Sequence, residues 1–113
     1  NPLAVAVGIE VIKIITADGF LNSVDSNARL LWNKLKELEK KFDEIIEIRG
    51  AGYLLGIKTK SNNTEINNLF TKNGLLCVTA ADNIIRISPP IIVNKKEINE
   101  ALQIIEKTLK EKI

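Results

Sequence analysis

Arg86 is the residue whose type and position point most directly to chemistry. It stands in the apolar run 84–88, which ends at Pro89 and Pro90. The run predicts a strand, and a guanidinium in such a strand calls for an anion, because its fork of donors matches a carboxylate bidentately. That carboxylate belongs either to a small ligand or to a neighbouring part of the protein. The alternative is an edge-strand arginine that points into water.

Other reactive groups are scarce. The sequence has no histidine and one cysteine, Cys77, which excludes a Ser-His-Asp or Cys-His arrangement and a metal cluster. Catalysis would need Lys, Asp, Glu, Tyr or a cofactor. The net charge of +2 and the 4% of aromatic residues do not favour nucleic acid or a membrane surface as a partner. The composition by itself favours a binding module.

The length of 113 residues fits one small domain. A single cysteine cannot form an internal disulfide, so we expect a reduced, cytoplasmic protein. The apolar segment 3–15 contains Glu10 and Lys13, is too short to cross a bilayer, and lacks the basic start and cleavage site of a signal peptide. It predicts a buried helix and not a membrane anchor.

Two helices are predicted in the first third of the chain. Segment 2–16 has proline at its start and apolar residues on nearly every face, so it needs cover from a second domain or subunit. After Asp18 and Gly19, an amphipathic helix of about six turns follows, and an ordinary core-facing helix fits better than a coiled coil of barely three heptads. Its apolar face is predicted to carry Leu21, Val24, Ala28, Leu31, Leu35, Leu38 and Phe42.

The remaining segments alternate strands and helices. Segments 45–49 and 53–58 predict strands joined by a glycine-rich hairpin at 50–52; a phosphate loop is the weaker alternative, because no helix follows. Capping-box spacing at 62–65 begins a short helix that ends at Asn73-Gly74. A strand at 75–79, a turn at 80–83 and the strand at 84–88 follow, so that Cys77 and Arg86 are predicted to lie on adjacent strands. The last element is a helix that begins with the capping box 94–97. One face of this helix is predicted to carry Ile98, Ala101, Leu102, Ile105 and Leu109.

The element order α-α-β-β-α-β-β-α predicts the fold class. It indicates an α+β domain of two layers, with a mostly antiparallel four-stranded sheet and helices on one face. The first, apolar helix precedes this domain.

Four motifs follow one another along the sequence. They are Asn1-Pro2-Leu3-Ala4, Arg49-Gly50-Ala51-Gly52 with Tyr53-Leu54-Leu55-Gly56, Gly74-Leu75-Leu76, and Ile85-Arg86 before Pro89-Pro90. With these motifs in this order, the sequence resembles, over its whole length, the C-terminal part of the class III, fold-type I, pyridoxal-phosphate-dependent aminotransferases. The connection between Lys60 and Glu65 and the stretch 78–80 look most like acetylornithine aminotransferase.

The resemblance implies a function. Such enzymes are homodimers that use pyridoxal 5'-phosphate to carry an amino group from a donor, here N-acetylornithine or a related amine, to 2-oxoglutarate, a step of arginine biosynthesis. It implies that Arg86 binds the substrate α-carboxylate, that residues 1–17 are a helix connecting to an upstream large domain, and that residues 18–113 are the small domain. The family's catalytic and cofactor-binding residues match none in this chain, so we expect the chain alone to be inactive and to hold no cofactor.

Two other functions stay open. The chain could be a stand-alone regulatory module that binds an amino acid, or a structural interaction domain in which Arg86 makes an interdomain salt bridge. The amino donor is also open between acetylornithine, succinyl-diaminopimelate, ornithine and 4-aminobutyrate.

Overall fold

The computed structural model describes residues 1–112 and has the predicted order of elements. Ile113, the last residue of the predicted small domain, lies outside the described residues. The helices and strands are α1 (Pro2–Ile15), α2 (Phe20–Lys41), β1 (Ile45–Ala51), β2 (Leu54–Thr59), α3 (Asn63–Lys72), β3 (Val78–Ala80), β4 (Ile84–Ile87) and α4 (Lys95–Lys112).

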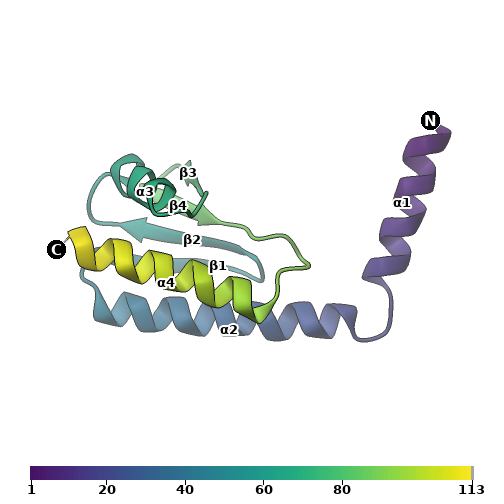
Figure 1. Cartoon of the computed structure of the whole chain (residues 1–113), viewed down its shortest axis with the longest axis horizontal. Coiled ribbons are helices and arrows are strands. Elements are labelled where there is room, and N and C mark those ends of the chain that lie inside the picture. Colours follow the sequence, from purple (N-terminus) through teal and green to yellow (C-terminus); the bar gives the residue numbers. More distant parts are fainter. Residues whose placement is uncertain (113) are drawn as a thin grey trace.

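The four strands form one antiparallel sheet in the order β1-β2-β4-β3. Two local hairpins, β1–β2 and β3–β4, are joined through the pairing of β2 with β4, which are separated in sequence by α3. Helices α2, α3 and α4 cover one face of this sheet (Figure 1). The other face is left uncovered by residues 1–112, and we call it the open face. The predicted α+β class is confirmed, with every strand pair antiparallel.

The core lies between the sheet and these helices. Ile48, Ile57 and Ile85 face one another across three adjacent strands and are at most 3% exposed. Alternation along a strand sends the residues between them to the opposite side, so burial of one face determines which side chains reach the open face. The largest fully buried core side chains are Phe70, Leu35, Ile57, Ile66, Ile85, Ile98, Ile105 and Leu109.

The third strand differs from its prediction. It begins at Val78 and not at 75, so Cys77 lies before the strand, and Val78 is the residue paired with Arg86. The backbone N–H of Leu75 donates to Phe70 O at the end of α3, and the Asn67 side chain donates to the carbonyl of Cys77 at 3.3 Å. Residues 75–77 are therefore held by α3 and not by a strand ladder.

Side-chain capping bonds support the starts predicted for α3 and α4. The Asn62 side chain accepts from the N–H groups of Thr64 and Glu65 at the start of α3. At α4, Asn94 and Glu97 exchange both bonds of a capping box, at 2.9 and 2.8 Å. These local bonds place α4 against the sheet soon after the diproline.

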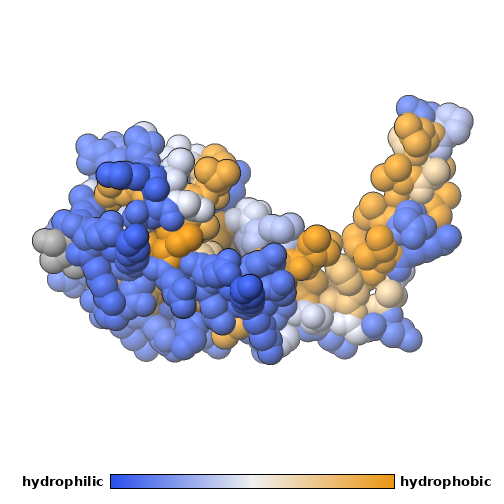
Figure 2. All heavy atoms as spheres, in the orientation of Figure 1, coloured by the Kyte–Doolittle hydropathy of each residue, from blue (hydrophilic) through white to orange (hydrophobic). Residues whose placement is uncertain are grey.

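Helix α1 is exposed along most of its length and projects away from the rest of the molecule (Figure 1). Figure 2 shows its surface as mostly hydrophobic. Leu3, for example, is 73% exposed. The prediction that Leu21 belongs to the core face of α2 is wrong, because Leu21 lies on the first turn, beyond the reach of the sheet, and is 57% exposed. Among the described residues, no helix is long and apolar enough to cross a membrane.

Glu106 links the two long helices. Its carboxylate pairs with Lys41 at the end of α2 and with Lys110 on α4, and hydrogen bonds from these two lysines hold the pKa of Glu106 below its usual range. A carboxyl group with a lowered folded-state pKa stabilises the fold above its unfolded pKa of about 4.3, and that stabilisation is lost as the pH falls through the folded pKa.

We therefore expect Glu106→Gln to lower the free energy of unfolding by about 0.5 kcal/mol near neutral pH, the scale of a surface ion pair. At a pH well below the lowered folded-state pKa of Glu106, the variant and the parent should be equally stable, because the carboxyl is then protonated in both the folded and unfolded states. Urea denaturation at the two pH values measures the difference. An equal loss at both would show that Glu106 acts through packing instead.

Candidate functional site

Arg86 lies on the open face, in the middle of the sheet. Strand β4 pairs with β2 on one side and β3 on the other, so it is not an edge strand, and that part of the alternative is wrong. Its cross-strand partners are Gly56 and Val78. The Arg86 side chain is exposed, and among residues 1–112 the structure records no ion pair for it. A guanidinium on a backbone fixed by two ladders is thus open to an external anion.

Gly56 shapes the surface next to Arg86. It sits between Arg49 of β1 and Arg86 of β4 in a single cross-strand row. A Cβ at this position would lie 2.7 Å from Cγ2 of Ile84 and 3.7 Å from Cγ of Arg49. The contact with Arg49 would be an ordinary one, but Ile84 would have to move, so glycine lets Ile84 pack over β2 without displacement. The row therefore has a guanidinium on either side of a strand position without a side chain.

A chain of ion pairs occupies the part of the open face next to this row. Glu47 Oε2 lies 2.6 Å from Nη2 of Arg49, and Asp82 Oδ2 lies 3.1 Å from Nη1 of the same guanidinium. The second Asp82 oxygen, Oδ1, lies 2.8 Å from Nζ of Lys58. Lys58 and then Arg49 hold the pKa of Asp82 below its usual range, while Glu47 and then Asp82 raise that of Arg49. Asp82 and Arg49 are therefore both charged at neutral pH.

Only part of this chain of ion pairs has a signal in the sequence. The structure pairs Lys58 with Asp82, which lie 24 residues apart. Glu47 and Arg49, two residues apart on one strand, gave a signal that they share a face. Asp82 joins them only because β2 pairs with β4, and the sequence carries no local signal for that pairing.

The turn that carries Asp82 is built by neighbouring asparagines. Asp82 and Asn83 adopt positive φ angles of 60° and 57°, which Asp and Asn tolerate better than other residues with side chains. The Asn83 side chain donates to the carbonyl oxygens of Thr59 and Ser61, each at 2.7 Å, and accepts from the N–H of Asn63 at 2.8 Å. These bonds fix the turn to the loop that follows β2.

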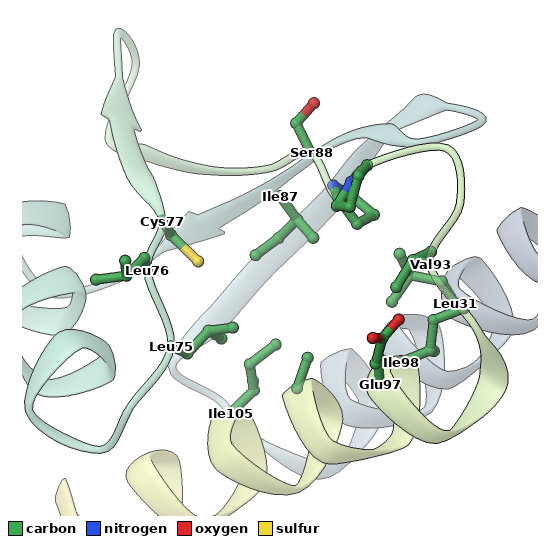
Figure 3. Close-up of a pocket in the computed structure, with 13 residues that line it drawn as sticks. Leu31, Leu75, Leu76, Cys77, Ile87, Ser88, Val93, Glu97, Ile98 and Ile105 are labelled. Carbon is green, nitrogen blue, oxygen red and sulfur yellow. The ribbon is translucent and has the colours of Figure 1, made fainter.

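A separate apolar cavity of about 280 Å³ lies on the helix-covered side of the sheet (Figure 3). Ser88 points away from the other labelled side chains, and Glu97 at the edge is already used in its capping box. Burial raises the pKa of the Cys77 thiol to about 11, so the thiol is protonated at neutral pH and is a poor nucleophile. The lining residues are Leu31, Leu75, Leu76, Cys77, Ile87, Ser88, Pro89, Pro90, Val93, Glu97, Ile98, Ala101 and Ile105.

Arg86 does not line this cavity, so the two features are distinct. The part of the chain that the structure describes also holds no cluster of three or more His, Cys, Asp or Glu residues that could bind a metal ion. The phosphate-loop alternative at Gly50 and Gly52 is wrong, because β1 continues through Gly50 and pairs with β2 in a hairpin. The open face around Arg86 is the candidate site.

Comparisons with known proteins give a consistent result. Residues 1–109 match the family described as aminotransferase class-III. Acetylornithine aminotransferase of Mesorhizobium japonicum is 43% identical over 103 residues, which cover 90% of this chain and 26% of the relative. Acetylornithine aminotransferase of Caldanaerobacter subterraneus is 40% identical over 112 residues, covering 98% of this chain and 28% of the relative.

Solved structures agree with the sequence relatives. The crystal structure of acetylornithine aminotransferase from Elizabethkingia anophelis has a TM-score of 0.90 at 28% identity, and ornithine δ-aminotransferase of Plasmodium falciparum has 0.88 at 32% identity. Each similarity covers 98% of this chain and 30% of the solved chain. This chain thus spans less than a third of the length of these relatives, and by sequence and fold it belongs to the class III aminotransferase family.

Proposed function

We propose that this chain is the C-terminal, substrate-carboxylate-binding part of an aminotransferase that transfers an amino group from N-acetylornithine or a related amine to 2-oxoglutarate. In this proposal Arg86 binds the α-carboxylate of the substrate, and the reaction is a cytoplasmic step of arginine biosynthesis. The observation that carries the proposal is the exposed Arg86 guanidinium, held on a central strand and recorded without an ion pair in residues 1–112. The names of the similar acetylornithine aminotransferases support the choice of donor.

The described residues do not fit the cofactor of this family. Class III aminotransferases depend on pyridoxal phosphate, which needs a lysine to carry it and donors for its phosphate. The lining of the apolar cavity contains no lysine, and Lys58 on the open face is already paired with Asp82. In our proposal the cofactor is therefore held by the upstream large domain, and this chain supplies only the arginine that binds the substrate carboxylate.

The exposed α1 helix is consistent with an upstream large domain that packs against this chain. Apolar residues on all of its sides remain in water within this chain, and a large domain packed around residues 1–17 would cover them. We propose that large domain as the partner of α1, in an enzyme that is a homodimer. A structural role for Arg86, as an interdomain salt bridge, is the competing function, and the exposed helix is what favours it.

Transamination of N-acetylornithine with 2-oxoglutarate tests the proposal. We expect the full-length enzyme to be active and this chain alone to be inactive, because the chain lacks the cofactor-binding residues. The chain alone should also show no absorbance band of protein-bound pyridoxal phosphate at about 420 nm. A stoichiometric band in the isolated chain would contradict the proposal. Tight binding of an amino acid by the isolated chain would instead favour a stand-alone amino-acid-binding module.

A further inference from the structure

We propose that Asp82 and Glu47 are specificity-determining residues of the open face: they occupy Arg49 and Lys58, so that Arg86 is left as the single anchor for a carboxylate. This inference rests on the proposed function of Arg86 and adds to it. It assigns a role to two acidic residues that do not themselves touch substrate.

The charges on this face are placed close together. Arg49 and Arg86 lie on either side of Gly56 in one row, and adjacent strands are about 4.8 Å apart, so their Cα atoms are about 10 Å apart. Lys58 lies on β2, two residues beyond Gly56 on the same face. The open face therefore presents three cationic side chains, Arg49, Lys58 and Arg86, on three adjacent strands. Without neutralisation, any of them could attract a substrate carboxylate.

The two carboxylates remove that competition. Asp82 uses both oxygens, one for Lys58 at 2.8 Å and one for Arg49 at 3.1 Å, and Glu47 takes the remaining terminal nitrogen of Arg49 at 2.6 Å. Each terminal nitrogen of Arg49 thus already donates to a carboxylate, and these contacts compete with bidentate binding of a further carboxylate by the same guanidinium. Among residues 1–112, the structure records no such partner for Arg86. Specificity here comes from blocking the wrong positions as well as from offering the right one.

The position of Asp82 does not depend on its ion pairs. The Asn83 and Asn63 hydrogen bonds hold the turn, and asparagine tolerates the positive φ of 60° at position 82. Asp82→Asn should consequently leave the turn and β4 in place while it removes the negative charge. Lys58 would then be released, and Arg49 would lose its contact through Nη1 while Glu47 still holds Nη2.

A double substitution separates this inference from the proposed function. We would titrate the full-length holoenzyme with 2-oxoglutarate in the absence of amino donor and compare Arg86→Ala with Arg86→Ala/Asp82→Asn. Removing Arg86 should weaken binding strongly. The added Asp82→Asn should then tighten binding again by about tenfold, the scale of one charge-assisted contact, without restoring turnover. Glu47→Gln in the Arg86→Ala background should act in the same direction through Arg49.

Asp25→Asn is the matched control, because Asp25 pairs only with the exposed Arg29 of α2 among the described residues and should leave the titration unchanged. If Arg86→Ala weakens binding but neither Asp82→Asn nor Glu47→Gln restores any, this inference is wrong and the proposed function stands. If Arg86→Ala itself leaves 2-oxoglutarate binding and turnover intact, the proposed role of Arg86 fails first. Recovery of both binding and turnover would also overturn the inference, since it would make Arg49 an equivalent anchor.

Discussion

Arg86→Ala in the full-length enzyme is expected to lower kcat/KM for 2-oxoglutarate by about two orders of magnitude or more. A bidentate pair between a guanidinium and a carboxylate is worth about 1.5 to 3 kcal/mol, and loss of substrate orientation adds to that cost. The backbone of β4 is held by ladders on both sides, so the substitution should not disturb the fold. Steady-state kinetics, together with the unfolding midpoint, measure the two effects separately.

Two other substitutions control this experiment. Arg86→Lys keeps the charge but loses the planar fork, so it should recover only part of the activity. Arg29→Ala removes an exposed arginine of α2 that pairs with Asp25, and it should leave kcat/KM within about twofold of the parent. If Arg86→Ala retains full activity but weakens assembly of the enzyme, Arg86 makes an interdomain salt bridge and the substrate site lies elsewhere.

Gly50→Ala should be the most destabilising single-methyl change in the β1–β2 hairpin. Gly50 has a φ of 118°, and a Cβ there would overlap the backbone carbonyl oxygen of Leu54. Backbone strain of this kind costs about 1–3 kcal/mol before the overlap is relieved, so we expect a loss of about 3 kcal/mol or more in the free energy of unfolding. Against a typical total of about 5–15 kcal/mol, that loss is large.

Gly52→Ala provides the matched comparison in the same hairpin. Gly52 also has a positive φ, 56°, but a Cβ there meets nothing within 4 Å. Its substitution should cost only the left-handed backbone term, about 1 kcal/mol. Urea denaturation of both variants measures the difference. Equal losses at the two positions would mean that the Leu54 carbonyl moves aside and that overlap is not what requires glycine at position 50.

Local signals in the sequence predicted the elements of the fold well. The capping residues Asn62 and Asn94 placed the starts of α3 and α4, and apolar spacing placed α2 from Ala28 to Leu38. The errors came where contacts with another element, and not the residue pattern itself, decide the structure. Residues 75–77 have strand-like composition, yet hydrogen bonds to α3 hold them out of the sheet. Leu21 has the right spacing for the core but lies beyond the end of the sheet.

The candidate site was predicted only in part for the same reason. Arg86 could be singled out from its own neighbours in sequence, because a charged fork in an apolar strand is unusual. Its setting could not, because the order β1-β2-β4-β3 places Gly56 and Arg49 beside it through pairing across α3. The ion pairs of Asp82 follow from that pairing as well. Which charged side chains pair with one another on the open face is thus determined by the tertiary structure.

The pairing of β2 with β4 also affects the order in which parts of the chain fold. Each hairpin closes over a short loop, whereas the register of Lys58 with Ile84 must close a loop that contains all of α3, and loop closure makes such contacts slower to form. In a chain in which only the two hairpins have formed, Arg49 lies on the β1–β2 hairpin and Arg86 on the β3–β4 hairpin. Arg86 and the ion pairs of Arg49 and Lys58 come together only when the two hairpins pair. A partly folded chain therefore contains the residues of the candidate site but not their arrangement.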